Sequence, residues 1–118
     1  MKRRRALKVS EFIKREVSLM LLKEVRDPRI GFCTITRVEV SKDLRLAKIY
    51  LTFWGGEEEK KEGMIGIRSA TPFLQREVGR RLGIRYTPRL LFLYDQEWED
   101  TGRVLEILDN LRDNDKGG

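Results

Sequence analysis

The sequence predicts an α+β fold, a two-layer sandwich in which helices pack on one face of a three-stranded sheet. Two segments with strand-type alternation, 32–40 and 45–53, follow one another directly. Helix-type periodicity occupies the segments before and after them, and residues 84–94 are strand-like again. A hairpin followed by helices and a returning strand is typical of two-layer α+β domains. With 118 residues the chain is expected to form one domain with a modest core.

Residues 6–25 are expected to form an amphipathic first helix. Apolar side chains recur there with the spacing of a buried helical stripe: Ala6, Val9, Ile13, Val17 and Met20. The opposite side of the helix carries three basic residues, Arg4, Lys8 and Arg15. This basic side is either an ordinary solvated surface or a ridge that binds phosphates. The motif Asp27-Pro28-Arg29 is expected to stop the helix, because the residue before a proline disfavours helical geometry.

The two consecutive strands are expected to pair as an antiparallel hairpin across the polar turn 41–44. The second strand alternates cleanly, and its core-facing residues are Ala47, Ile49, Leu51 and Phe53. In the first strand, the apolar residues change parity between Ile35 and Val38. Because a slip of one residue turns every side chain to the other face, either a β-bulge lies near Thr36-Arg37 or both faces are partly covered.

Two helices, about 57–70 and 72–82, are expected next, with a break between them at Thr71-Pro72. Three glutamates open the first of these helices, where negative charge suits the positive end of the helix dipole. Proline in a helix interior removes a hydrogen bond and clashes with the preceding turn, at a cost of about 3 kcal/mol. Threonine is a good N-cap and proline a good first helical residue, so a new helix is expected to begin there. Gly83 is expected to end it.

The last predicted strand, 84–94, contains Pro88, which indicates a strand edge, a bulge or a late strand start because proline cannot donate to a ladder. A final helix is expected after this strand, with Asp95 capping a turn at the junction. The predicted organisation is a core domain over 1–95, a C-terminal helix over 96–112 that packs on or beside the core, and a disordered tail over 113–118.

The charge balance indicates which class of partner the chain could bind. Its 25 Lys and Arg against 19 Asp and Glu give a net charge of +6 and a pI near 9.7. That balance favours a polyanion such as nucleic acid, although basic domains without an anionic partner exist. Residues 1–54 carry 14 basic and 6 acidic groups, whereas residues 96–118 carry 3 and 7. A surface that faces a polyanion is therefore expected to come mainly from the first half.

The residue inventory argues against catalysis. The chain has no histidine, which excludes histidine-dependent triads, bases and metal ligands. Cys33 lies in an apolar strand and is interpreted as a core thiol. Gly55-Gly56 is followed by glutamates, which would repel a phosphate. No apolar run suits a membrane span or a signal peptide. The expectations are therefore no enzymatic activity, no cofactor, no metal, no small-molecule substrate, no membrane partner and a cytoplasmic location.

The predicted order, α-β-β-α-break-α-β, matches the type II arrangement of the K-homology (KH) fold. Many KH domains clamp a nucleotide backbone with a Gly-x-x-Gly loop at the break between the two central helices. Four arginines flank the break in this sequence: Arg68, Arg76, Arg80 and Arg81. Phe53, Phe73 and Phe92 sit on apolar patterns, whereas Tyr50 and Tyr86 are freer and are candidates for stacking on bases.

Four stretches together resemble the ribosome-binding factor A family. They are Asp27-Pro28-Arg29, Thr36-x-Val38-x-Val40-Ser41-x-Asp43-Leu44, Ala47-x-x-Tyr50, and Ile84-Arg85-x-x-Pro88-x-Leu90-x-Phe92-x-x-Asp95 followed by Gly102. The resemblance covers about residues 5–110 in the order of the predicted elements. This family has an Ala-x-Gly kink between its central helices, where this sequence has Ala70, Thr71 and Pro72. The bend is therefore expected to come from proline.

The resemblance implies a monomeric, non-catalytic assembly factor that binds the small ribosomal subunit through its rRNA and ribosomal proteins. It also implies a role in late maturation of the 5′ end of that rRNA, including in the cold. A generic KH-type single-stranded RNA-binding protein is the alternative, followed by a small enzyme or a protein-only adaptor.

The candidate RNA- and ribosome-binding residues are basic residues of the first helix and of the region around the break. They are Arg3, Arg4, Arg5, Lys8, Arg15, Arg68, Arg76, Arg80 and Arg81. The motif Asp27-Pro28-Arg29 is either a helix stop or a further contact.

Overall fold

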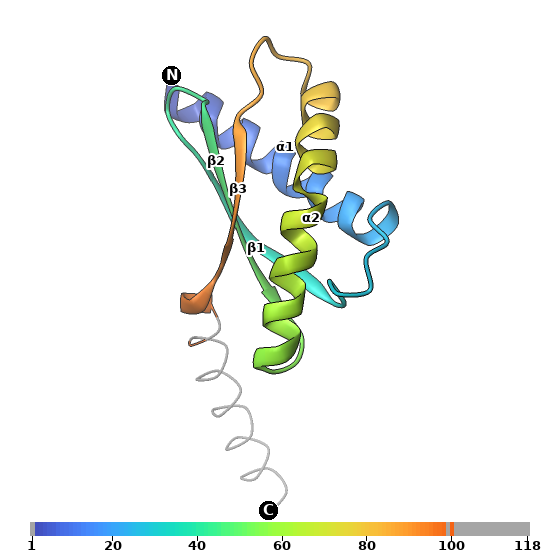
Figure 1. The fold of residues 1–118 in the computed structure, drawn as a ribbon. Helices are drawn as coiled ribbons and strands as arrows, with labels where there is room; N and C mark the ends of the chain where they lie inside the picture. Colours follow the sequence, from blue (N-terminus) through green and yellow to red (C-terminus); the bar gives the residue numbers. More distant parts are fainter. Residues whose placement is uncertain (1, 99, 101–118) are drawn as a thin grey trace, which may run out of the picture.

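The computed structural model describes residues 2–98 and 100 and confirms the predicted α+β class (Figure 1). The elements are, in order, α1 (Lys2–Lys23), β1 (Cys33–Val40), β2 (Leu46–Phe53), α2 (Glu57–Leu82) and β3 (Arg89–Tyr94). The strands form one sheet of order β1-β2-β3, in which β1 is antiparallel and β3 parallel to β2. Side chains of both helices and all three strands share one hydrophobic core. The predicted C-terminal helix and tail lie outside the described residues, apart from 96–98 and 100, which are helical.

The apolar stripe of α1 is buried as predicted, because it faces the sheet. Ala6, Val9, Ile13, Val17 and Met20 are all buried. The helix begins and ends earlier than its apolar pattern indicates. Its end is marked by the amides of Glu24 and Val25, which both donate to the carbonyl of Met20 at 2.8 Å. The Asp27-Pro28-Arg29 motif therefore lies beyond the helix end and forms the turn that follows.

That turn is held by a short ion pair. The Asp27 carboxylate accepts the Arg29 amide at 3.0 Å and pairs with the Arg29 guanidinium at 2.6 Å. Hydrogen bonding to the Arg29 side chain lowers the pKa of Asp27 to about 2, so the pair is charged at neutral pH. The turn packs against α2 at Gly66, where an added Cβ would come within 2.7 Å of Ile30. The motif thus has a structural role in the fold.

The change of parity in β1 is a β-bulge, the first of the two alternatives. Ile35 pairs with Leu51 and Arg37 pairs with Tyr50, so Thr36 is the extra residue. Beyond the bulge, Val38 pairs with Ile49, which is fully buried, and the apolar residues of both halves of β1 share the inner face. Because the bulge adds one residue to β1, the apolar side chains before and after it point to the same covered face of the sheet, although their parity changes in the sequence.

The prediction of two central helices was wrong, because α2 is one helix of 26 residues with Pro72 inside it. Thr71 is not an N-cap, since its hydroxyl donates to the carbonyl of Ile67 at 2.8 Å, one turn earlier. Ile67, Leu74 and Val78 lie on both sides of the proline and are all buried in the same core. Burial of about 1.5–3 kcal/mol for each such side chain outweighs the cost of an interior proline of about 3 kcal/mol.

Both ends of α2 follow the prediction. The helix begins at Glu57, and the Glu59 carboxylate accepts the amide of Gly56 at 2.9 Å. It ends at Gly83, which adopts the left-handed conformation with φ of 67° and donates its amide to the carbonyl of Gly79.

β3 starts late, directly after the buried Pro88, as one of the three alternatives predicted. Gln75 of α2 fixes this start with its side-chain amide. It donates to the carbonyl of Pro88 at 2.8 Å and accepts the amide of Leu90 at 2.9 Å. Residues 84–88 consequently form a loop that protrudes beyond the sheet (Figure 1).

Candidate nucleic-acid interface

Arginines from three segments converge at the end of the sheet where β2 and β3 begin. Because these strands are parallel, their first residues are neighbours, and the amide of Arg89 donates to the carbonyl of Arg45 at 2.8 Å. The N-terminal part of α1, the β1–β2 turn and the loop between α2 and β3 all lie at this end (Figure 1). Arg5 and Arg85 join the cluster from α1 and from that loop.

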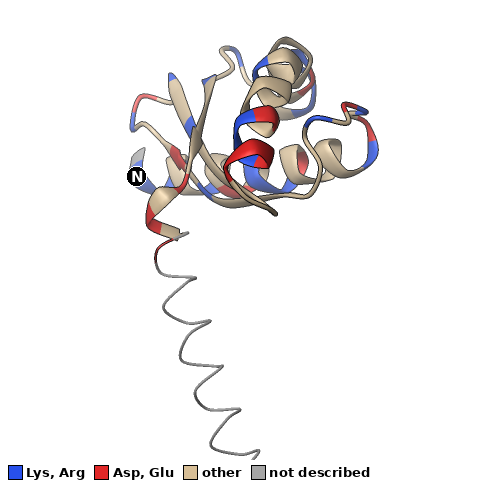
Figure 2. Ribbon diagram, turned by 60° about the horizontal axis from the view of Figure 1, so that its bottom comes forward, with Lys and Arg blue, Asp and Glu red and all other residues tan. Residues whose placement is uncertain are grey.

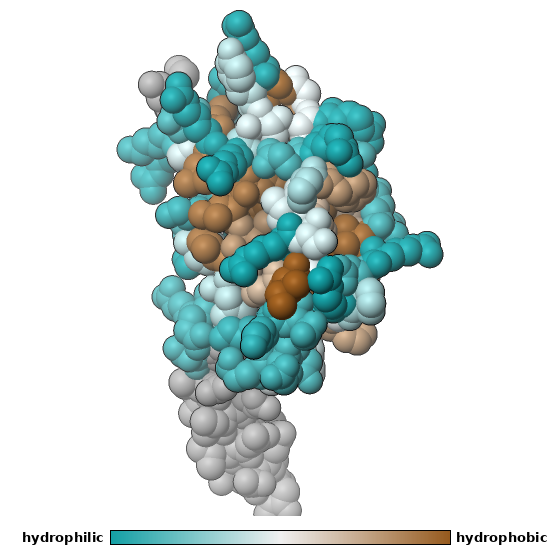
Figure 3. Space-filling view, viewed as in Figure 1, coloured by the Kyte–Doolittle hydropathy of each residue, from teal (hydrophilic) through white to brown (hydrophobic). Residues whose placement is uncertain are grey.

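The convergence forms an open hollow of about 620 Å³, which we call the arginine hollow. Its lining residues are Arg5, Asp43, Leu44, Arg45, Ile84, Arg85, Tyr86, Thr87 and Arg89. All four guanidinium-bearing side chains are exposed. Hydrophilic side chains cover this upper end in Figure 3, whereas hydrophobic surface gathers at mid-height.

The hollow has a net positive charge, because its one carboxylate balances only one of four arginines. Asp43 accepts the hydroxyl of Ser41 at 2.6 Å and the amide of Arg45 at 3.1 Å. These hydrogen bonds, that of Ser41 foremost, lower the pKa of Asp43. Asp43 therefore stays ionised and shapes the turn. Four arginines around one concave surface match the geometry and charge of phosphate groups.

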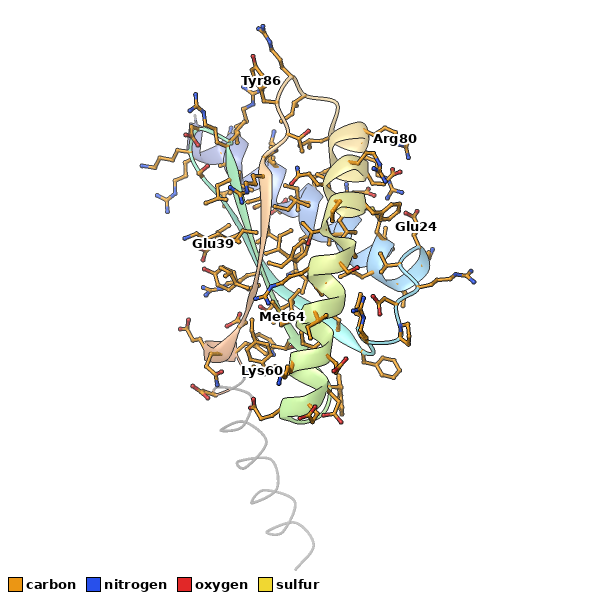
Figure 4. All side chains as sticks on the ribbon, viewed as in Figure 1. Glu24, Glu39, Lys60, Met64, Arg80 and Tyr86 are labelled. Carbon is orange, nitrogen blue, oxygen red and sulfur yellow. The ribbon has the colours of Figure 1, made fainter. Side chains whose placement is uncertain are left out.

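Tyr86 adds an aromatic ring to the hollow. Its side chain is 72% exposed at the tip of the loop between α2 and β3, and the Arg85 guanidinium lies 5.4 Å from the ring centroid (Figure 4). The other stacking candidate, Tyr50, is covered by the guanidinium of Arg37 at 4.0 Å. The structure thus favours Tyr86 as a ring on which an unpaired base could stack.

The predicted residues of α1 lie in two places. Arg5 lines the hollow, and Arg3, Arg4 and Lys8 are exposed on the same N-terminal half of the helix. Arg15 lies further along, with its guanidinium 5.6 Å from the ring centroid of Phe12. Of the candidate residues on α1, the hollow therefore includes only Arg5, and the three residues of the predicted ridge, Arg4, Lys8 and Arg15, do not line it.

The four predicted arginines of α2 differ in whether they form ion pairs. Arg68 and Arg76 are exposed, and neither makes an ion pair with another described residue. Arg80 pairs with Glu77 at 2.8 Å. Arg81 is only 23% exposed and binds Glu16 and Glu24 of the α1 region, at 3.2 and 2.8 Å, as well as Glu77. It joins α1 to α2, and its role as a phosphate contact stays a prediction.

The region of Ala70, Thr71 and Pro72 offers no loop to a nucleotide backbone. Ala70 and Thr71 are half-buried within the continuous helix, and only Pro72 is exposed. A KH-type clamp needs free amides and small residues at this point. The arginine hollow, not the predicted break, is therefore the candidate interface.

Sequence reasoning missed Arg45 and Arg89 and named Arg85 only within a motif. The sequence held only a positional signal for them, since Arg45 opens the predicted strand 45–53 and Arg89 lies within the predicted strand 84–94. Parallel pairing of the second and third strands would have placed Arg45 beside Arg89. The order of the strands alone did not reveal that pairing.

The described residues give little support for other chemistry. Burial raises the pKa of the Cys33 thiol to about 12, which makes it a poor nucleophile at neutral pH. Within residues 2–98 and 100, no group of three or more Cys, Asp or Glu side chains could hold a metal ion. None of the helices in this part of the chain is long and apolar enough to cross a membrane.

Comparison with known proteins gives one consistent result. A family profile described as RBFA, ribosome-binding factor A, matches residues 5–108. Ribosome-binding factor A of Halothermothrix orenii is 43% identical over 116 residues, which cover 98% of this chain and 95% of that protein.

Solved structures agree with the sequence comparisons. The crystal structure of ribosome-binding factor A from Thermus thermophilus aligns with a TM-score of 0.61 and 25% identity, over 75% of this chain and 94% of that one. A homology model of the Thermus protein, fitted into a cryo-EM map of a 30S–RbfA complex, aligns over 75% and 89% of the two chains, with a TM-score of 0.55 and 24% identity.

Proposed function

The chain belongs to the ribosome-binding factor A family, and from this premise we propose that it is a non-catalytic assembly factor of the small ribosomal subunit. It acts as a monomer in the cytoplasm, binds the rRNA of the immature subunit and supports late maturation of the 5′ end of that rRNA, including in the cold. A Thermus relative fitted into a 30S complex supports the choice of subunit.

The observation that carries the proposal is the arginine hollow. Arg5, Arg45, Arg85 and Arg89 neutralise phosphates of an rRNA segment, which releases counterions. Tyr86 stacks on an unpaired base of the same segment, as aromatic side chains do in single-strand binders. The exposed Arg3, Arg4 and Lys8 extend this surface along α1, and Arg15, Arg68, Arg76, Arg80 and Arg81 remain further candidates.

Cosedimentation tests this function with one double variant in the hollow and one matched double variant as the control. The protein is expected to pellet with small but not large subunits at low salt and to dissociate at high salt. Reversing two charges of the hollow, Arg85→Glu with Arg89→Glu, is expected to weaken binding by at least about tenfold, because it replaces two attractions by repulsions. The control, Lys23→Glu with Arg26→Glu, makes the same charge change at two exposed residues away from the hollow.

Two outcomes would contradict the proposal. Equal weakening by both pairs would mean that net charge, rather than the hollow, determines binding. Equal affinity for small subunits and for any single-stranded RNA would instead indicate a generic KH-type RNA-binding protein. The maturation role is tested separately, by mapping the 5′ ends of small-subunit rRNA at low temperature in cells without the factor, where unprocessed ends are expected to accumulate.

A further inference from the structure

The end of the hairpin opposite the arginine hollow exposes large hydrophobic side chains. Leu22, Phe32 and Trp54 are 78%, 81% and 79% exposed. Phe32 and Trp54 lie side by side, since the Trp54 amide donates to the Phe32 carbonyl at 3.0 Å, just outside the ladder of β1 and β2. We call these three residues the aromatic end. Burying each side chain would gain about 1.5–3 kcal/mol, and such exposed groups mark interaction sites.

Two hollows meet at the aromatic end. One, of about 430 Å³, lies between Trp54 and the first turns of α2, and the other, of about 230 Å³, lies between Phe32 and Leu22. Ile30 and Gly31 line both hollows. The two hollows therefore adjoin at Ile30 and Gly31, so one extended segment that passes over these two residues could contact both Phe32 and Trp54.

The hollow beside Trp54 is acidic. Glu58, Glu59 and Glu62 line it, and the start of α2 is marked by acidic residues in Figure 2. The one cation in its lining, Arg29, is already paired with Asp27 at 2.6 Å. Glu59 caps the helix through the Gly56 amide, whereas Glu58 and Glu62 make no ion pair within the described part of the chain. The surface is therefore unsuited to a phosphate backbone.

Glu62 acts electrostatically on Arg29, but this guanidinium is already paired with Asp27, so Glu62 has no ion-pair partner of its own among the described residues. The helix dipole stabilises acidic residues within the first turn, which accounts for Glu58 but not for Glu62 one turn later. Glutamates four residues apart on a helix repel each other, at a cost of about 0.2–0.5 kcal/mol. A cationic ligand that lies between both carboxylates and the indole ring would remove this repulsion.

We infer that the aromatic end binds a basic protein segment, in which arginine or lysine residues alternate with apolar ones. The cation lies on the face of the Trp54 indole, the strongest cation–π partner among side chains, with Glu58 and Glu62 around its charge. A neighbouring apolar side chain packs against Phe32 and Leu22. This inference goes beyond the proposed function, because it adds a protein partner at the end opposite the RNA surface.

Tryptophan fluorescence tests the inference directly. The chain has two tryptophans, so the variant Trp98→Phe leaves Trp54 as the only indole. The probe is a synthetic peptide of arginine and leucine residues spaced by glycine and serine. The expected result is a saturable shift of the Trp54 emission that weakens as salt is added. The same peptide with glutamate in place of arginine is expected to give none.

Matched variants assign the effect to the two carboxylates. In the Trp98→Phe background, Glu58→Gln with Glu62→Gln is expected to weaken peptide binding about three- to tenfold, as loss of two surface charge interactions should. Glu11→Gln with Glu39→Gln changes net charge equally on α1 and β1 and is expected to leave binding unchanged.

Three results would each overturn the inference: no saturable shift with the basic peptide, equal binding of the acidic peptide, or equal loss in both variant pairs. An equal shift with oligouridylate would overturn it as well, because the site would then not select a basic segment over a polyanion. None of these results bears on the proposed function, which is read from the arginine hollow and from subunit binding.

Discussion

Asp95 is a buried carboxylate whose partners come from the β-bulge of β1 and from the residues that follow β3. Its side chain accepts the hydroxyl of Thr36 in the β-bulge at 2.5 Å and the amide of Trp98 at 2.9 Å. The Arg37 guanidinium lies 3.6 Å away. Burial alone raises the pKa of Asp95, but these partners together lower it below its usual value. The bulge residue thus fixes the end of β3.

Replacing this carboxylate is expected to destabilise the protein in a pH-dependent way. Asp95→Asn should lower the free energy of unfolding by about 2 kcal/mol at pH 7, since hydrogen bonds to a charged group are lost. Because the folded pKa lies below the unfolded one, the carboxylate stabilises the fold above about pH 4, and its contribution disappears as the pH falls through the folded pKa. Urea unfolding at several pH values measures both effects.

Glu39→Gln is the control for Asp95, because Glu39 is exposed, and a change within about 0.5 kcal/mol is expected. A difference between Asp95→Asn and the original protein that does not shrink as the pH falls below about 4 would contradict the assignment, since protonation of Asp95 removes its difference in charge from asparagine.

Patterns in the sequence predicted which side chains are buried better than they predicted which side chains hydrogen-bond to one another. The alternation in β2 and the stripe of α1 identified the inner faces, because each side chain there contributes to the same core. The change of parity in β1 even located the bulge. Its hydrogen bond to Asp95 was not predictable, because the two residues are 59 positions apart and meet only through the sheet.

At the scale of elements, α2 shows how tertiary packing overrides a local signal. The Thr71-Pro72 pair is a good helix start in isolation. In the protein, apolar residues on both sides of the proline share one core, so the helix continues through it. Local propensity predicted the ends of this helix, at Glu57 and Gly83, and failed only where packing opposed it.

Removal of the proline is expected to stabilise the protein. Pro72→Ala restores an amide that can donate to the carbonyl of Arg68, and the exposed ring gives up little packing. The gain should be about 2 kcal/mol, which is the cost of an interior proline less its effect on the unfolded chain. Thermal and urea unfolding measure it, with Ser69→Ala as an exposed neighbouring control. An unchanged or lower stability would mean that Pro72 itself contributes to the packing of α2.

For the whole molecule, charge is separated between two ends of one hairpin. The arginine hollow lies where β2 and β3 begin, and the acidic start of α2 lies beyond the end of β2 (Figure 2). A polyanion is therefore attracted to one end and repelled from the other, which gives the bound protein a defined orientation.

The salt dependence of subunit binding is expected to identify the arginines that contact phosphate. Single alanine substitutions of Arg45, Arg85 and Arg89 should each reduce the slope of log affinity against log salt by about 0.7–1, because each removes one phosphate contact. The same substitutions at Arg68 and Arg76 of α2 provide the comparison. A larger reduction at the α2 residues would place the interface on that helix instead.

The fold was predictable from the sequence to a greater extent than the site. Every helix and strand contributes to one core, so the spacing of apolar residues predicted the order of the elements and which face of each one is buried. The arginine hollow depends on which strand ends are neighbours, and its members Arg5, Arg45, Arg85 and Arg89 are spread over most of the chain. The run of basic residues in α1 could be seen in the sequence, whereas a cluster that folding assembles from arginines in separate segments could not.

In the proposed function, the dispersal of these arginines would couple RNA binding to folding. In an unfolded chain Arg5, Arg45 and the pair Arg85 and Arg89 are separated by long stretches of backbone, so only the native state would offer all four together to a phosphate backbone. A ligand that binds only the native state adds a free energy of RT ln(1 + [L]/Kd), or about 2.7 kcal/mol at a hundredfold excess over Kd. Binding to the ribosomal subunit would therefore raise the free energy of unfolding of its assembly factor. The bound protein would resist heat and proteolysis under conditions in which the free protein unfolds or is cleaved.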